Sequence, residues 1–144
     1  MKAREIMTPS PACCSADDSL QDVACIMRDQ DCGAVPVTEK GQLVGIITDR
    51  DLTVRALAVG KNADARVGEV VTRDPACCGA DDDIRSIEKV MAERQVRRVP
   101  IVDGDGHCVG IVSQADLARA AMTGGLVSEH EVATVLESVS EPSR

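Results

Sequence analysis

The pattern of hydrophobic and polar positions divides the first part of the chain into five predicted elements. A short apolar run comes first, and hydrophobic residues then recur at the spacing of one helix face, after capping side chains at residues 17–19. Two apolar runs joined by a Gly-containing turn follow, and a second helical stretch ends at Gly60. The predicted elements are a strand at 12–14, a helix through Leu20, Val23, Ala24 and Met27, strands at 34–38 and 42–47, and a helix that starts at Thr48 or Asp49 and carries Leu52, Arg55, Ala56 and Val59.

The same order of elements returns 64 residues later, which makes the repeat a folding unit and not a local motif. Pro-Ala-Cys-Cys at 11–14 recurs at 75–78, Val-Pro at 35–36 recurs at 99–100, and Gly-Ile at 45–46 recurs, after a slip of one residue, at 110–111. The second copy predicts a strand at 76–78, a helix through Ile84, Ile87 and Met91, strands at 99–102 and 108–112 joined by a turn at 103–106, and a helix from Gln114.

These elements predict an α/β (α+β) fold, a tandem pseudo-two-fold repeat of strand-helix-strand-strand-helix. The predicted domains are repeat 1 at 1–60, a linker at 61–66, repeat 2 at 67–124 and a tail at 125–144. In the tail, Val132, Val135, Leu136 and Val139 share one stripe and predict a C-terminal amphipathic helix over 128–140. Each copy is too small to bury a sufficient core alone, so we expect the copies to pack on one another and a ligand site to lie where they face.

Composition limits the chemistry that this chain can use. No Phe, Tyr or Trp is present among the 144 residues, so the core must be aliphatic and no ring can stack on a base. The net charge of −8 argues against nucleic acid as a partner. Because the chain shows neither an apolar run of membrane-spanning length nor a signal-peptide pattern, we expect a cytoplasmic protein that does not enter a membrane.

The seven cysteines are expected to be reduced thiols, since the count is odd and no secretion signal is present. Neighbouring residues on a strand point to opposite faces, so neither vicinal pair, 13–14 or 77–78, chelates a metal easily. Structural packing and thiol sensing both remain open for these pairs. His107 and His130 are isolated in the sequence and suit loop or surface roles, so no metal ligands are predicted.

Two spans, 45–51 and 110–116, each run from an apolar strand into a hydroxyl residue and then, three positions on, a carboxylate. A hydroxyl and a carboxylate at this spacing lie on the same side of the first turn of a helix, where free backbone N–H groups also point outward. The pairs are Thr48 with Asp51 and Ser113 with Asp116. This chemistry suits a ribose, whose hydroxyls the carboxylate accepts, and its phosphate, which the hydroxyl residue and the helix start meet.

Together with the Val-Pro strands and the Glu-x-x-Thr sequences at 5–8 and 69–72, these spans resemble the cystathionine β-synthase (CBS) domain pair, or Bateman module, of the stand-alone bacterial type. The resemblance covers residues 3 to about 120. It implies that adenosine-type ligands bind between the repeats, each site taking its hydroxyl and carboxylate from one repeat and its base pocket from the other.

Carried over by position, the resemblance implies two sites that are not equivalent. The first comprises Gly45, Ile46, Thr48 and Asp51 with Ala76, Cys77, Arg97, Arg98 and Pro100. The second comprises Gly110, Ile111, Ser113 and Asp116 with Ala12, Cys13, Gly33, Ala34 and Pro36. Two guanidinium groups in the first site predict a phosphorylated adenosine compound there, and a weaker, less charged or absent ligand in the second. The alternative interpretations are that the two aspartates only cap helices and that the two arginines are an ordinary solvated pair.

The function expected from the resemblance is a non-enzymatic regulatory or sensor module. Its ligand would be AMP, ADP, ATP, NAD or S-adenosylmethionine, held as a regulatory ligand, with no cofactor required. We expect a homodimer that signals to a separate, unidentified protein partner. No recognised catalytic motif or phosphate loop is found, so no catalytic residue is predicted. The alternative is a stress-related scaffold or interaction protein with vestigial nucleotide sites that responds to thiol redox state.

Overall fold

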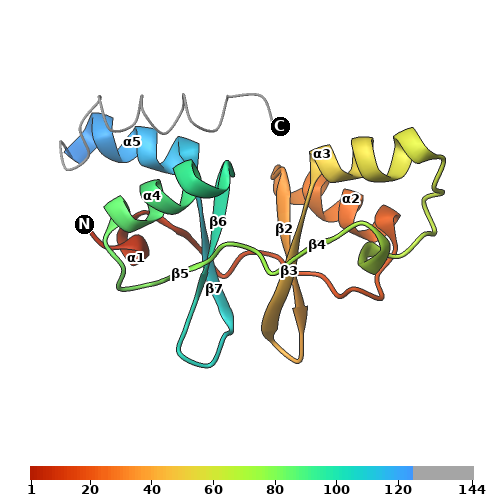
Figure 1. The fold of residues 1–144 in the computed structure, drawn as a ribbon, viewed down its shortest axis with the longest axis horizontal. Coiled ribbons are helices and arrows are strands. Elements are labelled where there is room, and N and C mark those ends of the chain that lie inside the picture. Colours follow the sequence, from red (N-terminus) through yellow and green to blue (C-terminus); the bar gives the residue numbers. More distant parts are fainter. Residues whose placement is uncertain (125–144) are drawn as a thin grey trace. The chain divides into compact units, whose positions relative to one another are not determined.

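The computed structural model describes residues 1–124, which divide between two compact units (Figure 1). Of the described residues, unit 1 contains Met1–Ser10, Ala76–Asp105 and 109–124, and unit 2 contains Pro11–Pro75 with Gly106–Cys108. The predicted domain boundaries follow the repeat in the sequence and not these two units. They therefore stay a prediction. The predicted tail helix and His130 lie outside the described residues.

Unit 2 is built on a three-stranded antiparallel sheet in the order β2-β3-β4. The backbone of Cys14 adds a parallel bridge to Val37 on the free side of β2. Ser19 caps α2, since its hydroxyl accepts from the backbone N–H of Asp22 at 3.0 Å. The elements are α2 (Leu20–Gln30), β2 (Ala34–Glu39), β3 (Gln42–Thr48), α3 (Asp49–Asp51), a π-helical turn η1 (Leu52–Ala56), 3₁₀ turns η2 (Leu57–Val59) and η3 (Val67–Glu69), and β4 (Thr72–Arg73).

Unit 1 repeats this plan around a four-stranded sheet in the order β1-β7-β6-β5. The short strand β5 runs parallel to β6, and β1 pairs antiparallel with β7. The elements are α1 (Ala3–Ile6), β1 (Thr8–Pro9), β5 (Cys78–Gly79), α4 (Ile84–Arg94), β6 (Arg98–Val102), β7 (Cys108–Ser113) and α5 (Gln114–Gly124).

The opening segment of each repeat packs on the other repeat. In unit 1, the backbone N–H of Ala3 donates to the carbonyl of Asp82 at 2.9 Å, and β1 pairs with β7. In unit 2, the N–H of Val67 donates to the carbonyl of Asp18 at 2.8 Å, and β4 pairs with β3. The positions of the opening segments are 64 residues apart, and those of β3 and β7 are 65 apart after the slip of one residue, so the exchange follows the repeat.

Each unit has its own aliphatic core, as the composition predicted. In α2 and α4 the helix positions predicted to face inward are buried, except that Ala24 is exposed. In the helical segment after β3 only Ala56 of the four predicted positions is buried, whereas Leu52 is half-buried and Arg55 and Val59 are exposed. Cys14 and Cys78 are buried and pack in these cores as small hydrophobic residues, whereas Cys13 and Cys77 are exposed. The alternation predicted for adjacent cysteines is therefore confirmed.

The largest departure from the predicted elements is the helix after β3, which changes type twice before it ends at Gly60. The hydroxyl of Thr53 donates to the carbonyl of Asp49 at 3.1 Å, the group that its own N–H would use in an α-helix. Such back-bonding loosens the regular hydrogen-bond ladder and accompanies the widened turn. The predicted strand at 12–14 is a single bridge at Cys14, and the predicted strand at 76–78 begins only at Cys78.

Within residues 1–124, no helix combines the length and the apolar character needed to cross a membrane.

Candidate functional site

The predicted hydroxyl–carboxylate pair of the first repeat forms a reciprocal cap at the start of α3. The backbone N–H of Asp51 donates to Oγ1 of Thr48 at 3.2 Å, and the N–H of Thr48 donates to Oδ2 of Asp51 at 2.9 Å. Thr48 is extended while Asp51 is helical, which is the usual geometry of a capping box. The structure therefore places the two side chains together on one face of the first turn, as predicted.

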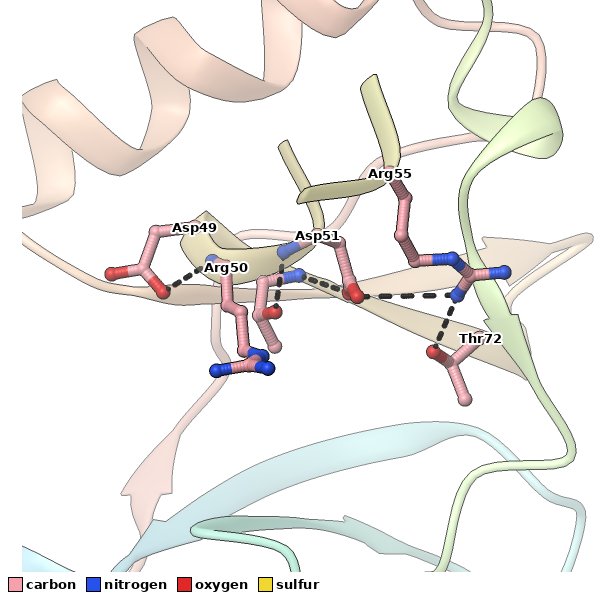
Figure 2. A network of polar contacts seen from close by, with 6 residues as sticks. Asp49, Arg50, Asp51, Arg55 and Thr72 are labelled. Carbon is pink, nitrogen blue, oxygen red and sulfur yellow. Dashed lines mark hydrogen bonds and ion pairs between the residues drawn. The ribbon is translucent and has the colours of Figure 1, made fainter. Parts of the chain in front are cut away.

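The second carboxylate oxygen of Asp51 faces a cation. Its Oδ1 lies 3.9 Å from Nη1 of Arg55, and the same nitrogen donates to Oγ1 of Thr72 on β4 at 3.1 Å (Figure 2). The side chain of Asp51 is 14% exposed and that of Arg55 is 48% exposed, so the arginine end of this chain of contacts is accessible to solvent.

Unit 1 reproduces the same cap with a different hydroxyl residue. The backbone N–H of Asp116 donates to Oγ of Ser113 at 3.2 Å, and the N–H of Ser113 donates to Oδ2 of Asp116 at 2.8 Å. Oδ1 of Asp116 accepts from Nη2 of Arg119, three residues further along α5. The Asp116 side chain is 8% exposed, which makes it the more deeply buried of the two carboxylates.

The expectation of free backbone N–H groups at the helix start is wrong for unit 2. The N–H of Asp49 donates to the carbonyl of Gly33 at 2.9 Å, that of Arg50 to Oδ1 of Asp49 at 2.8 Å, and that of Asp51 to Thr48. Short Asp and Thr side chains compete for these donors because they need no separate ligand. Any anion at this helix start would have to displace an existing acceptor.

The glycines of the two Gly-Ile motifs lie closely against another segment of their own unit. A Cβ built on Gly45 would lie 2.5 Å from Cγ2 of Val71 and 2.8 Å from the carbonyl oxygen of Thr72. A Cβ built on Gly110 would overlap the side chain of Met7. Both glycines thus let the exchanged opening segment of the other repeat approach a central strand.

Some of the other residues predicted for the two ligand sites lie next to the hydroxyl–carboxylate caps. In unit 2, Ala34 pairs with Thr48 in the sheet, which places it beside the cap. In unit 1, the carbonyl of Arg97 accepts from the N–H of Gln114 at 3.0 Å. By exposure, Ala12, Cys13, Cys77 and Arg97 are exposed, Gly33, Ile46, Ala76, Arg98 and Ile111 are half-buried, and Ala34, Pro36, Gly45, Pro100 and Gly110 are buried. Each predicted site takes residues from both units, so its assembly stays a prediction.

Sequence analysis missed the two arginines that face the carboxylates. Arg55 lies four residues after Asp51 and Arg119 three residues after Asp116, spacings at which side chains meet on a helix. Both contacts could have been predicted from this spacing once the aspartates were placed at helix starts. The contact from Arg55 to Thr72 could not have been predicted from the sequence, because it depends on the exchange of opening segments between the repeats.

The CBS domain family model matches this chain twice, at residues 3–57 and 67–123. The chain belongs to the CBS domain family. One relative, the CBS domain-containing protein YhcV of Bacillus subtilis, is 36% identical over 120 residues, which cover 83% of this chain and 85% of that relative. The fold and the two repeats predicted from the sequence are thereby confirmed.

Two solved CBS structures with small ligands are similar to this chain. A structure of hypoxic response protein I with two coordinated zinc ions is 36% identical, with a TM-score of 0.76, and the match covers 83% of this chain and 98% of that one. The CBS domain pair of protein MJ0100, in complex with 5′-methylthioadenosine and S-adenosyl-L-methionine, is 28% identical, with a TM-score of 0.76 and the same coverage of both chains. CBS pairs of this size therefore include proteins that bind adenosine compounds.

Proposed function

We propose that this protein is a non-enzymatic regulatory module that binds adenosine-type ligands through its two hydroxyl–carboxylate pairs. The observation that carries the proposal is the occurrence of the same cap, with the same hydrogen bonds, at Thr48–Asp51 and at Ser113–Asp116. A purely structural cap needs only one carboxylate oxygen, and in both units the second oxygen faces an arginine that a ligand could displace. The adenosine compounds bound by MJ0100 support the same ligand class.

The cap at Thr48 and Asp51 leaves a carboxylate oxygen and a hydroxyl hydrogen that could bind a nucleoside phosphate. Oδ2 of Asp51 is occupied by the N–H of Thr48, whereas Oδ1 is 3.9 Å from Arg55 and can accept from ribose hydroxyls once the arginine moves. Oγ1 of Thr48 accepts within the cap, so its own hydrogen is available to a phosphate oxygen. Arg55, released from the carboxylate, would remain near enough to neutralise that phosphate.

We further propose that the two sites differ in their ligands. In the first site, Arg97 and Arg98 would add two guanidinium groups from the other repeat, together with Ala76, Cys77 and Pro100. The second site has Gly33 and Ala34 at the matching positions, with Ala12, Cys13 and Pro36, and offers no such charge. The first would take a phosphorylated adenosine compound, and the second a less charged ligand or none.

The output of such a module would be read by a separate protein, with a homodimer as the working form. Three apolar side chains on the helical segment after Asp51 support an association surface on unit 2. The exposed fractions of Val54, Leu57 and Val59 are 47%, 77% and 65%. Analytical ultracentrifugation of the wild type against Leu57→Glu tests the dimer, because a charge at a buried interface should shift the chain to monomer.

The test of ligand binding is isothermal titration with AMP and with S-adenosylmethionine. Asp51→Asn is the sharpest variant, because its side-chain oxygen can still accept from Thr48 and keep the cap while the charge is lost. A charge-assisted hydrogen bond contributes about 1.5–3 kcal/mol, so we expect AMP to bind about 10- to 150-fold more weakly. Asp116→Asn is the matched control and should leave AMP affinity within about threefold, a difference of less than 1 kcal/mol.

Loss of AMP binding in Asp116→Asn alone would show that the assignment of the phosphorylated ligand to the first site is wrong. The alternative function, an interaction protein with vestigial sites, predicts no binding at all. Since the chain lacks Trp and Tyr, purine carried through purification is directly visible in the ultraviolet spectrum. Neither a purine band nor a heat of binding would favour that alternative.

A further inference from the structure

Cys13, which is exposed, lies against the β2–β3 hairpin of unit 2. Its neighbour Cys14 holds the segment there, because the N–H of Cys14 donates to the carbonyl of Pro36 at 3.0 Å. The N–H of Thr38 in turn donates to the carbonyl of Cys14 at 2.9 Å. Because adjacent side chains alternate, burying Cys14 in the core turns the thiol of Cys13 outward.

A second thiol is brought to the same hairpin from a distant part of the chain. Residues 106–108 belong to unit 2, where Gln42 forms an antiparallel bridge with His107 and the N–H of Leu43 donates to the carbonyl of Gly106 at 2.9 Å. These contacts hold Cys108, which is half-buried, at the start of β7 beside β3. The pairing of β1 with β7 continues to Ser10, whose backbone N–H donates to the carbonyl of Val109 at 3.1 Å, so the next residue, Pro11, lies beside Cys108. The thiol of Cys13 donates to the carbonyl of Pro11, which brings the two cysteines, 95 residues apart in sequence, to the same place.

The two thiols contact one another. A side-chain hydrogen bond from Cys108 lowers the pKa of the Cys13 thiol to about 7, because the accepted bond stabilises the thiolate. Sγ of Cys13 also lies 3.3 Å from the carbonyl oxygen of Pro11, to which the protonated thiol donates. The reactive form of a cysteine is the thiolate, so an exposed cysteine with this partner is a good nucleophile near neutral pH.

We propose that Cys13 and Cys108 are a redox-active dithiol, with a low-molecular-weight disulfide of the glutathione class as its oxidant. The Cys13 thiolate attacks one sulfur of the reagent, forming a mixed disulfide and releasing one thiolate. Cys108 then loses its proton to solvent and attacks the Cys13 sulfur, which forms the Cys13–Cys108 disulfide and releases the second thiolate. The two protein thiols are oxidised, and one reagent disulfide is reduced to two thiols.

The repeat supplies an internal contrast for this pair. Cys77 occupies the position of Cys13 in the second Pro-Ala-Cys-Cys motif and is likewise exposed. The position that matches Cys108 in the first repeat is Leu43, which carries no thiol. Of these two matching cysteines, Cys13 therefore faces a thiol at this position, whereas the matching position for Cys77 carries a leucine. Cys13 also belongs to the proposed second ligand site, so the test is made without nucleotide, and its outcome does not depend on either hydroxyl–carboxylate pair.

The experiment treats the reduced full-length chain, without nucleotide, with oxidised glutathione, and maps the products by non-reducing tryptic digestion and mass spectrometry. Cleavage places Cys13 in peptide 5–28, Cys108 in peptide 99–119 and Cys77 in peptide 74–85. We expect peptide 5–28 joined to 99–119 in the wild type and in Cys77→Ser. The joined peptide should fall by about tenfold or more in Cys13→Ser and in Cys108→Ser, because the second step is fast only within one molecule.

Three results would overturn the proposal. One is a wild type in which Cys13 stops at the mixed disulfide with glutathione. The second is a joined peptide that persists in Cys13→Ser, which would implicate Cys14 or Cys25 of the same peptide. The third is peptide 5–28 joined to 74–85 instead. Far-ultraviolet circular dichroism of each variant, and the accumulation of glutathionylated Cys13 in Cys108→Ser, separate loss of the partner thiol from loss of the fold.

Discussion

The two motif glycines should differ in their tolerance of a methyl group, because different atoms face them. In Gly45→Ala the new Cβ would lie 2.5 Å from Cγ2 of Val71 and 2.8 Å from the backbone carbonyl oxygen of Thr72. In Gly110→Ala the three nearest atoms all belong to the side chain of Met7, namely Sδ, Cγ at 2.9 Å and Cβ at 3.2 Å. A thioether side chain can change rotamer, whereas a carbonyl held in β4 moves only if the strand moves.

Overpacking a well-filled site costs about 1–3 kcal/mol. We place Gly45→Ala near the upper end of this range, at about 3 kcal/mol, because β4 must shift or separate from β3. Gly110→Ala belongs near the lower end, at about 1 kcal/mol, because Met7 can rearrange. For a chain of this length the larger loss corresponds to a decrease in Tm of roughly 10 °C and the smaller to roughly 3 °C.

Urea unfolding followed by far-ultraviolet circular dichroism measures both variants. Gly104→Ala is the matched control, because a Cβ there meets nothing within 4 Å, so its free energy of unfolding should stay within about 0.5 kcal/mol of the wild type. Val71 is itself buried, so Gly45→Ala is also measured against Val71→Ala alone, and in that background it should still cost stability, since the carbonyl contact remains. Equal losses in the two single variants would refute the argument that the backbone carbonyl makes the difference.

Three further outcomes follow from the caps and the thiols. Thr48→Ala removes the acceptor of the Asp51 N–H and should lower the free energy of unfolding by about 0.5–2 kcal/mol, whereas Thr48→Ser should retain most of it in the same urea assay. Alkylation of the folded chain should label Cys13 with a midpoint near its pKa of about 7, while Cys14, whose pKa burial and then Asp18 raise to about 12, should resist until the chain unfolds. Burial likewise raises the pKa of Cys78 to about 11. Above pH 9.0, the ordinary pKa of a thiol, Cys14 and Cys78 therefore hold fewer protons in the unfolded chain than in the folded one. The free energy of unfolding should therefore fall as pH rises above 9, and Cys14→Ala should lessen that slope.

Most of the fold was predictable because its signals are local. Helix faces such as Ile84, Ile87 and Met91, and the turn at Gly60, follow from periodicity and glycine geometry within a few residues. The caps at Thr48 and Ser113 were also local, since each uses an acceptor three residues away. The exchange of opening segments was not predictable, because the pairing of β1 with β7 spans about a hundred residues and leaves no periodic signal.

The same distinction explains what sequence reasoning missed at the candidate site. It identified the hydroxyl and carboxylate of each pair but treated the helix start as a set of free donors. In the structure those donors are occupied by the carbonyl of Gly33, which is distant in the sequence, and by the neighbouring side chain of Asp49. It also considered Cys13 only within its vicinal pair and within the second ligand site, whereas residues 106–108 bring the thiol of Cys108 to Cys13.

The contacts of Arg55 indicate how ligand binding at Asp51 would be transmitted. Arg55 links the carboxylate of Asp51 to the hydroxyl of Thr72, and Thr72 belongs to β4, the exchanged segment of the second repeat (Figure 2). A ribose that takes Oδ1 of Asp51 would release Arg55, and Thr72 would lose a charged donor at the same moment. An exposed ion pair of this length contributes at most about 1 kcal/mol, so the exchange would be easily reversed. Arg55→Ala should therefore leave the fold nearly as stable as the wild type, and under the proposed function it should make the surroundings of β4 independent of ligand. Hydrogen exchange at the amides of residues 71–73 with and without AMP measures this, and protection that still changes with AMP in Arg55→Ala would show that Arg55 is not the link.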